Sequence, residues 1–140
     1  MDIRAIYKSR CKRASASDWQ AILASARRYN PPHGITGALF CDGLNYVQVL
    51  EGEAGVVDRL FLRINDDARH DDVVLLVREP IEARMFADWA MGFVEIERFA
   101  REFTEIELGI GDVDQRVLTL LEALKRDQRL LAQVVSGYRY

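Results

Sequence analysis

The sequence predicts one α+β domain, and three observations carry this prediction. Two amphipathic helical segments each follow a segment with strand-like alternation. Asp42-Gly43 is a strong signal for a tight hairpin between two further strands, and a stripe of apolar residues at helical spacing lies near the C-terminus. The resulting order, strand-helix-strand-strand-helix-strand with one extra strand, is a ferredoxin-like arrangement with both early helices on one face of the sheet. The C-terminal helix is expected on the other face.

The composition excludes several classes of protein. At 140 residues the chain has the length of one domain that can bury a sizeable core without disulfides. Its net charge of −3 argues against a nucleic-acid-binding surface, and no apolar run approaches the roughly 18–20 residues that cross a bilayer. The first residues have no signal-peptide layout, and the two cysteines and two histidines form no disulfide or metal-binding motif. We therefore expect a cytoplasmic protein that uses no metal and contacts neither nucleic acid nor membrane.

The first strand and the first helix are expected before a pair of prolines. Apolar and polar residues alternate over residues 3–8, which is typical of a short strand, and the polar stretch 9–16 predicts a connecting loop. Residues 17–20 have the spacing of a capping box, with the serine as N-cap, so a helix is expected to follow. It should end near Tyr29, because Pro31 disfavours helical geometry at the residue before it.

The strand after the hairpin places an amide side chain among hydrophobic residues. The expected second strand, residues 35–41, leads through the hairpin into a strand over residues 45–52, and both faces of that strand are largely apolar. It is therefore expected in the middle of the sheet, with Gln48 inside it. A buried amide left without hydrogen-bond partners costs roughly 1–3 kcal/mol. Gln48 is either a structural residue bonded to neighbouring backbone or part of a functional site.

The second half of the chain predicts one helix, two strands and a further helix. An amphipathic helix is expected over residues 54–65, a charged loop over 66–70, and a strand covered on both faces over the continuous apolar run 73–77. A last short strand is expected over about residues 90–94, and a helix from about Asp112 to Val135. The stripe on this helix should pack on the sheet, with a dimer or partner surface as the alternative. Its members are Val113, Val117, Leu120, Leu121, Leu124, Leu131 and Val134.

Five blocks of this sequence resemble those of the BLUF family, the blue-light sensors that use flavin. Each block alone is weakly specific, but all five occur in the expected order and spacing between residue 2 and about residue 95. The blocks are Ile6-Tyr7-Lys8-Ser9; Asn30 with Gly34-Ile35-Thr36-Gly37; Tyr46-Val47-Gln48-Val49-Leu50-Glu51-Gly52; Asp67-Ala68-Arg69-His70; and Glu79-Pro80-Ile81 with Phe86-Ala87-Asp88-Trp89-Ala90-Met91.

The resemblance implies a domain that holds an isoalloxazine ring between its two sheet-packed helices. FAD is the usual cofactor, with FMN and riboflavin as alternatives. The resemblance implies that Asn30 grips the pyrimidine edge of the ring and that Gln48 lies between the ring and Tyr7; an amide can pair with both donors and acceptors on that edge. It further implies that in blue light Tyr7 gives an electron and a proton to the flavin. Gln48 relays the proton and is left rotated or tautomerised.

The resemblance also implies roles for residues around this core. Positions that contact the ring or the exit toward the ribityl phosphate are matched by Arg63, Ile64, Asp67, Arg69 and His70. Trp89 and Met91 match positions that pass the change at the glutamine into the sheet. The alternatives are a solvated surface pair for Arg63 and Asp67, a loop-structuring role for His70, and plain packing for Trp89.

The chain departs from the family pattern near the end of the first helix. Many members have a serine there that could bond the ring edge, whereas this chain has Ala26, and Ser25 is expected on a different face of the helix. This puts a contact at the edge of the pocket in doubt. Tyr29 is expected as a stacking or edge contact for the flavin.

The resemblance divides the chain into a BLUF flavin-binding domain, residues 1–96, and a C-terminal helical extension packed on the sheet, residues 97–140. It implies a photoreceptor and not an enzyme. Because about 45 residues follow the family pattern, we expect the signal to reach a separate effector protein or to change self-association, and we expect a homo-oligomer. The identity of the partner, the oligomer number and the lifetime of the lit state do not follow from the sequence.

Three other classes of function compete with this prediction. A flavin enzyme lacks support, because no nicotinamide fingerprint or nucleophile–base arrangement is present. An acylphosphatase-like hydrolase on the same scaffold would need an anion-cradling loop after the first strand, where residues 8–13 are basic. A protein-interaction module without flavin is the third alternative. A colourless protein that does not bind added flavin would favour the last two.

Overall fold

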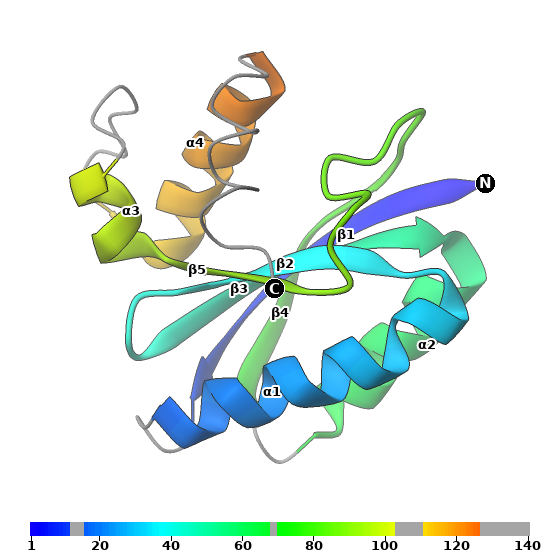
Figure 1. Ribbon diagram of the computed structural model, residues 1–140, viewed down its shortest axis with the longest axis horizontal. Helices are drawn as coiled ribbons and strands as arrows, with labels where there is room; N and C mark the ends of the chain where they lie inside the picture. The colour runs from blue at the N-terminus through cyan, green and yellow to red at the C-terminus, as the bar shows by residue number, and fades with distance from the viewer. Residues whose placement is uncertain (12–15, 68–69, 103–110, 127–140) are drawn as a thin grey trace.

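A five-stranded sheet in the order β4-β1-β3-β2-β5 forms the centre of the molecule (Figure 1). The computed structural model describes residues 1–11, 16–67, 70–102 and 111–126. The strands are β1 (Asp2–Cys11), β2 (Thr36–Cys41), β3 (Asn45–Glu53), β4 (His70–Pro80) and β5 (Gly92–Glu95). The helices are α1 (Ala16–Tyr29), the short 3₁₀ helix η1 (Pro31–His33), α2 (Ala54–Asn65), α3 (Ile96–Glu102) and α4 (Val113–Arg126). The first four strands have the ferredoxin-like order, and β5 extends the sheet parallel to β2, so the predicted fold class is confirmed.

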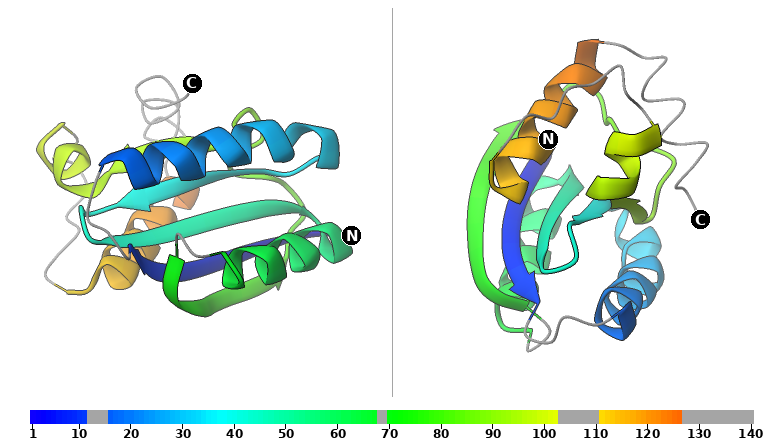
Figure 2. Two further views of the ribbon diagram at one scale, coloured as in Figure 1. Left: turned by 90° about the horizontal axis from the view of Figure 1, so that it is seen from below. Right: turned by 90° about the vertical axis from the view of Figure 1, so that its left-hand side faces the viewer.

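The sheet separates two hydrophobic cores. Helices α1 and α2 cover one face, and α3 and α4 cover the other (Figure 2). The core between the sheet and α1–α2, here the α2-side core, includes Ile3, Ala5, Tyr7, Ile22, Leu23, Leu39, Leu50, Val57, Leu60 and Met91. The core on the opposite face, here the α4-side core, includes Ile6, Val47, Val49, Phe86, Trp89, Val94, Phe99, Val117, Leu120 and Leu121. Alternate residues of β1, β2 and β3 belong to the two cores, as the pleat requires.

Strand β3 lies in the middle of the sheet, as its two apolar faces predict. It pairs antiparallel with both β1 and β2, and it is buried from Tyr46 to Gly52. The β1–β3 register places Tyr7 directly opposite Gln48. Residues directly opposite on one face of an antiparallel pair have Cβ atoms roughly 4.5–5.5 Å apart, so these two side chains are neighbours.

The helix boundaries follow local signals. Helix α1 ends at Tyr29, and the two prolines that stop it form η1. Its described part starts at Ala16 and includes Ser17, the predicted N-cap, within the helix. Helix α2 has the predicted bounds; the Glu53 side chain caps it by accepting a hydrogen bond from the backbone N–H of Val56 at 3.0 Å. The positive end of the helix dipole favours a carboxylate at this position.

Two predictions about the strands were wrong. Strand β1 does not stop near Lys8 but continues to Cys11, because β3 and β4 supply ladder partners on both sides of it. The anion-cradling loop that an acylphosphatase-like site would need therefore does not begin there. Strand β4 was expected to be covered on both faces, yet it is an edge strand, and Val74 and Leu75 are 45% and 43% exposed.

The C-terminal part packs on the sheet through the predicted stripe. Val113, Val117, Leu120, Leu121 and Leu124 are buried against the α4-side core. The helix is described to Arg126, and its predicted continuation from 127 to 135, with Leu131 and Val134, lies outside the described residues. Helix α3 was not predicted. No helix in the described segments has both the length and the apolar character needed to cross a membrane.

Candidate functional site

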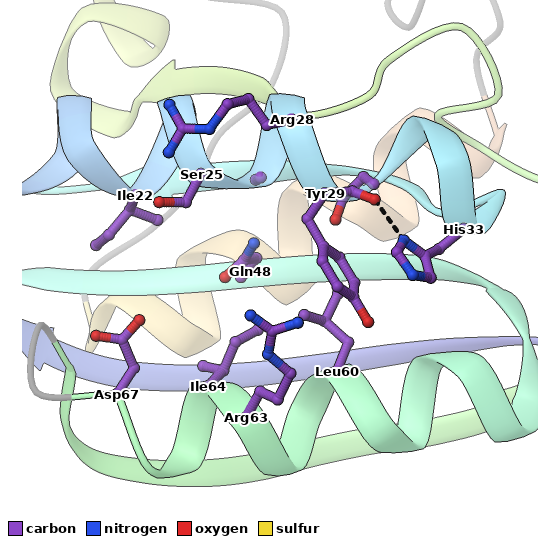
Figure 3. A pocket seen from close by; sticks show the side chains of 12 residues that line it. Ile22, Ser25, Arg28, Tyr29, His33, Gln48, Leu60, Arg63, Ile64 and Asp67 are labelled. Carbon is purple, nitrogen blue, oxygen red and sulfur yellow. Dashed lines mark hydrogen bonds between the residues drawn. The ribbon is translucent and has the colours of Figure 1, made fainter.

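A cavity of about 550 Å³ opens between α1 and α2 over the middle strand (Figure 3). Sites for small molecules and cofactors usually have volumes of roughly 300–1,000 Å³. The residues that line it are Ile22, Ser25, Ala26, Arg28, Tyr29, Asn30, His33, Gln48, Leu60, Arg63, Ile64 and Asp67. Aliphatic side chains from both helices form its walls, and polar groups lie at its floor and its mouth. This is the composition expected for a site that holds an aromatic ring and orients it by a few hydrogen bonds.

Gln48 projects from β3 into the space between the two helices (Figure 3). Its side chain is buried, and its Nε2 donates a hydrogen bond to the Met91 sulfur at 3.5 Å. Its Oε1 is buried and has no hydrogen-bond partner among the residues that the structure describes. An unsatisfied buried acceptor costs roughly 1–3 kcal/mol, so a bound molecule that donates to this oxygen would recover that energy.

Asn30 holds a second such oxygen at the exit of α1. The backbone of Asn30 is fixed, because its carbonyl oxygen accepts hydrogen bonds from the N–H groups of His33 and Ile35 at 3.1 and 3.0 Å. Its Nδ2 donates to the carbonyl oxygen of Ala90 at 2.8 Å, whereas its Oδ1 is buried without a partner in the described part of the chain. Asn30 and Gln48 thus contribute two fixed acceptors to one cavity.

Tyr7 lies next to Gln48 on the adjacent strand and is completely buried. The edge of its ring packs against Phe61 of α2, with 5.5 Å between ring centroids and 65° between ring planes. Burial raises the pKa of the Tyr7 hydroxyl well above its usual value, and the negative charge of Asp67 raises it further. Tyr7 is therefore a neutral phenol that keeps its proton at any physiological pH.

Basic and aromatic side chains gather at the mouth of the cavity. The Arg63 guanidinium lies 4.5 Å from the centroid of the Tyr29 ring, and the His33 ring stacks on Tyr29 with 3.9 Å between ring centroids. The His33 Nδ1 also lies 2.7 Å from the Tyr29 carbonyl oxygen (Figure 3). Arg28 adds a second guanidinium to the lining. Guanidinium groups pair well with phosphate oxygens, so this mouth suits a phosphorylated ligand.

Residues 3–92 match the model of a protein family described as sensors of blue-light using FAD, or BLUF. The chain belongs to the BLUF family. The match covers more than half of the chain and runs from β1 to the first residue of β5, so the predicted family membership is confirmed. BLUF domains are blue-light sensor modules and not catalysts.

Curated relatives share this BLUF segment. The beta subunit of photoactivated adenylate cyclase from Euglena gracilis is 31% identical over 119 residues, which cover 75% of this chain and 14% of that protein. The corresponding subunit from Euglena longa is 33% identical over 120 residues, with the same two coverages. The chain thus spans about 14% of the length of these relatives.

Solved BLUF structures have the same fold. The dark-state structure of the BLUF protein BlrB has a TM-score of 0.73 and 32% identity, and the alignment covers 85% of this chain and 91% of BlrB. Klebsiella pneumoniae BlrP1, solved with FMN and cyclic diGMP, has a TM-score of 0.67 and 32% identity over 91% of this chain and 35% of that chain.

Most residues that the BLUF resemblance singled out lie together. Five of them line the cavity: Asn30, Gln48, Arg63, Ile64 and Asp67. Tyr7 adjoins Gln48, and the negative charge of Asp67 helps to raise the pKa of the Tyr7 hydroxyl. Arg69 lies outside the described residues. His70 begins β4, and its side chain is outside the described part of the structure. The cofactor contacts of all these residues remain predictions.

The two predicted signalling residues lie on opposite sides of the sheet. Met91 belongs to the α2-side core and contacts Gln48, whereas Trp89 is fully buried in the α4-side core, with its ring centroid 5.3 Å from that of Phe86. Gly92 makes room for this indole, because a Cβ atom at residue 92 would lie 1.7 Å from Trp89 Cε3. The segment 89–91 therefore carries a side chain from each core.

One site expectation was wrong, and one contact was not foreseen. Ser25 was expected on a different face from Ala26, yet both residues line the cavity. Neighbouring residues on a helix differ by about 100°, and the face that α1 turns to the cavity is wide enough to include both. The unforeseen residue is Arg27, whose Nε donates to the Met91 carbonyl oxygen at 3.1 Å. No local sequence signal marks this contact, because it depends on where the segment before β5 lies.

Proposed function

We propose that this chain is a blue-light photoreceptor that binds FAD in the cavity between α1 and α2. The observation that carries the proposal is the pair of buried oxygens, Gln48 Oε1 and Asn30 Oδ1, which line one cavity and lack partners among the described residues. The pyrimidine edge of a flavin has an N–H donor flanked by carbonyl acceptors. Two amide side chains can pair with both kinds of group, so the residues present fit this cofactor.

Different residues of the cavity would bind different parts of the flavin. Asn30 and Gln48 would orient the pyrimidine edge, and Ile22, Leu60 and Ile64 provide apolar wall for the ring system. Arg28 and Arg63 would hold the phosphates at the mouth, which favours the phosphorylated flavins over riboflavin. We propose FAD as the bound form. Extraction of the bound flavin and measurement of its mass would distinguish FAD from FMN.

A flavin bound in this cavity supplies absorption of blue light and accepts one electron and one proton. Tyr7 is the residue placed to release both, because its neutral phenol lies beside Gln48. The proton would leave Tyr7 Oη for Gln48 Oε1, while Gln48 Nε2 would release one to the flavin. Return of the electron and the proton to Tyr7 would restore the phenol and leave the Gln48 amide rotated or tautomerised.

Reversal of the Gln48 amide would change its hydrogen bond to Met91. In the present arrangement Nε2 donates to the sulfur. A thioether sulfur accepts weakly and cannot donate, so an amide oxygen in the same place would make no hydrogen bond to it. Reversal would therefore loosen Met91 from β3. The amide has nearly the same shape in both orientations, so the switch needs little repacking of the surrounding core.

The route of the signal is toward the opposite face of the sheet. On β3, Val47 and Val49 flank Gln48 and belong to the α4-side core together with Trp89 and residues of α4. We propose that a change at Gln48 and Met91 alters this packing and thereby the affinity of α4 for a separate effector protein. A change in self-association is the second route. Equal effector affinities in darkness and light would count against the first.

The full chain with bound flavin tests the proposal. We expect a yellow protein whose absorption shifts reversibly to the red under blue light. Tyr7→Phe should keep flavin and abolish the shift, whereas Tyr46→Phe, which removes another buried hydroxyl from the same sheet face, should retain both. A protein that does not bind added flavin, or binds it without a light-induced shift, contradicts the proposal. A normal photocycle in Tyr7→Phe would show that the phenol is misassigned.

A further inference from the structure

We propose that Glu51 is a positioning residue that holds the segment 85–91 so that Met91 meets Gln48. This inference rests on the proposed photoreceptor function. Glu51 lies three residues after Gln48 on β3, on the opposite face of the sheet, and its side chain is fully buried. A buried carboxylate is costly unless it is paired and hydrogen-bonded, so its partners indicate what it does.

Glu51 binds the start of the segment through its backbone. Its Oε2 accepts a hydrogen bond from the Met85 N–H at 2.9 Å, and its Oε1 accepts one from the Phe86 N–H at 2.7 Å. These are charge-assisted bonds to two consecutive amides, which fix both the position and the direction of the chain there. Phe86 is in turn joined to Trp89, whose N–H donates to the Phe86 carbonyl oxygen at 3.1 Å.

The end of the same segment is bound by the candidate site. The Ala90 carbonyl oxygen accepts from Asn30 at 2.8 Å, the Met91 carbonyl oxygen accepts from Arg27 at 3.1 Å, and the Met91 sulfur accepts from Gln48 at 3.5 Å. The segment is thus fastened at both ends to β3, by Glu51 on one face and by Gln48 on the other. The amide contact is weak and reversible, whereas the carboxylate contacts are strong. Glu51 therefore fixes the point about which the Met91 end can move.

Arg4 supplies the countercharge that pairs with Glu51 and orients its carboxylate. It lies directly opposite Glu51 on β1, is nearly fully buried, and donates to Glu51 Oε2 from Nε at 3.0 Å and from Nη2 at 2.8 Å. Its Nη1 donates to Glu79 on β4 at 3.2 Å, and Glu79 lies 3.8 Å from Lys125 in the last turn of α4. Negative and positive side chains thus alternate from Glu51 through Arg4 and Glu79 to Lys125 of α4. Removal of Glu51 alone would leave the Arg4 charge buried without its main partner.

Glu51→Gln tests this role in the flavin-loaded full chain. A glutamine has the same size but one fewer acceptor oxygen and no charge, so it cannot hold both amides and Arg4 together. We expect unchanged flavin affinity, because Glu51 is on the far face of the sheet. We expect thermal recovery from the lit state to slow by roughly threefold or more, because recovery must return Met91 to Gln48 and the segment is no longer held in place. Recovery equal to that of the unsubstituted chain would overturn the inference.

Two further variants keep the test decisive. Asp58→Asn removes an exposed ion pair with Arg78 that does not touch the segment, and it should leave recovery unchanged. If Glu51→Gln does not fold, the double variant Arg4→Met/Glu51→Gln removes the unpaired charge and should fold with the same slow recovery. Normal recovery in the double variant would overturn the inference.

Hydrogen exchange in the unsubstituted chain separates this inference from the photoreceptor proposal. In darkness the amides of Met85 and Phe86 should be protected, whether or not the protein responds to light, and protection should disappear in the double variant. In light these two amides should stay protected while the amide of Gly37, which donates to the Trp89 carbonyl oxygen at 3.0 Å, exchanges faster. Unprotected amides at 85 and 86 in darkness would overturn the role of Glu51. A lack of any light response would instead contradict the photoreceptor proposal.

Discussion

The Nε2 of Gln48 lies 3.5 Å from the sulfur of Met91 and joins the middle strand to the segment that enters β5. This contact connects the residue expected to change in light with a segment that reaches both hydrophobic cores. Within the described residues it is also the only hydrogen bond that the Gln48 side chain makes. Rotation or tautomerisation of the amide must therefore alter its contact with Met91.

Met91→Leu should slow recovery of the dark state. Leucine has a similar volume, so the core should tolerate it, but it removes the acceptor for Nε2. A typical intramolecular hydrogen bond contributes about 0.5–1.5 kcal/mol, so the dark arrangement should lose up to about that much relative to the lit one. Recovery of absorbance in darkness after a blue flash measures the effect. Met85→Leu is the matched control, and an unaltered rate in Met91→Leu would show that the sulfur does not sense the amide.

Asn30→Ala should weaken flavin binding. The substitution removes the Oδ1 acceptor from the cavity and also the donor to Ala90. A lost hydrogen bond to a buried partner costs roughly 1–3 kcal/mol, which corresponds to a Kd higher by about 5- to 150-fold. Titration with flavin, followed by fluorescence quenching, gives the Kd. Asn65→Ala on the exposed end of α2 should bind as the unsubstituted chain does; equal affinity in Asn30→Ala would exclude an anchoring role.

The buried phenol should make the protein less stable at high pH. The pKa of Tyr7 is raised in the folded state, first by burial and then by Asp67, whereas the unfolded value is about 10. The folded state therefore binds the proton more tightly, and this contribution to stability is fully present below about pH 10 and is lost as the pH rises toward the folded pKa. Urea unfolding from about pH 9 to 11 should show a steeper decline in the chain with Tyr7 than in Tyr7→Phe. Parallel declines would contradict the pKa shift.

Substitution of Asp67 gives a second test of the raised pKa of Tyr7. Asp67→Asn removes the negative charge that disfavours the phenolate, so Tyr7 should titrate at lower pH than in the unsubstituted chain. Ultraviolet absorbance of tyrosinate follows this titration, and subtraction of the Tyr7→Phe curve isolates Tyr7 from the other four tyrosines.

Gly92→Ala should destabilise the fold through Trp89. The added methyl group would lie 1.7 Å from Trp89 Cε3, so the indole or the strand must move. Overpacking of a well-packed core typically costs about 1–3 kcal/mol, and more where backbone blocks the relaxation. In denaturant unfolding, Gly92→Ala combined with Trp89→Ala should lose less stability than the sum of the two single variants. Gly55→Ala, in helix α2, is the control; equal stability of Gly92→Ala and the unsubstituted chain would contradict the packing.

The parts of the fold that local patterns specify were predictable. Helix α2 has the predicted bounds because its apolar period and the preceding capping carboxylate both act within a few residues. The end of α1 is set by Pro31, and the middle position of β3 follows from its two apolar faces. The pleat alone puts Tyr7 on the same face of its strand as Ile3 and Ala5, and Gln48 on the same face as Tyr46 and Leu50.

The parts that depend on neighbours in space were not predictable. Strand β1 extends through polar residues because two strands pair with it, and no local propensity reveals those partners. The apolar run of β4 resembles a covered strand, yet its position at the edge is decided by topology. The Glu51–Arg4 pair and the hold of Arg27 on Met91 likewise join residues far apart in sequence. Register and tertiary placement supply these contacts, and a single sequence contains no direct signal for them.

The light-minus-dark absorption spectrum of flavin-loaded Gln48→Leu tests the central claim most directly. Leucine fills a similar volume but can neither bond the ring nor exchange its ends, so we predict that the variant retains flavin and shows no red shift under blue light that shifts the unsubstituted chain. A reversible red shift of normal size in Gln48→Leu would contradict the claim that this amide is the switch.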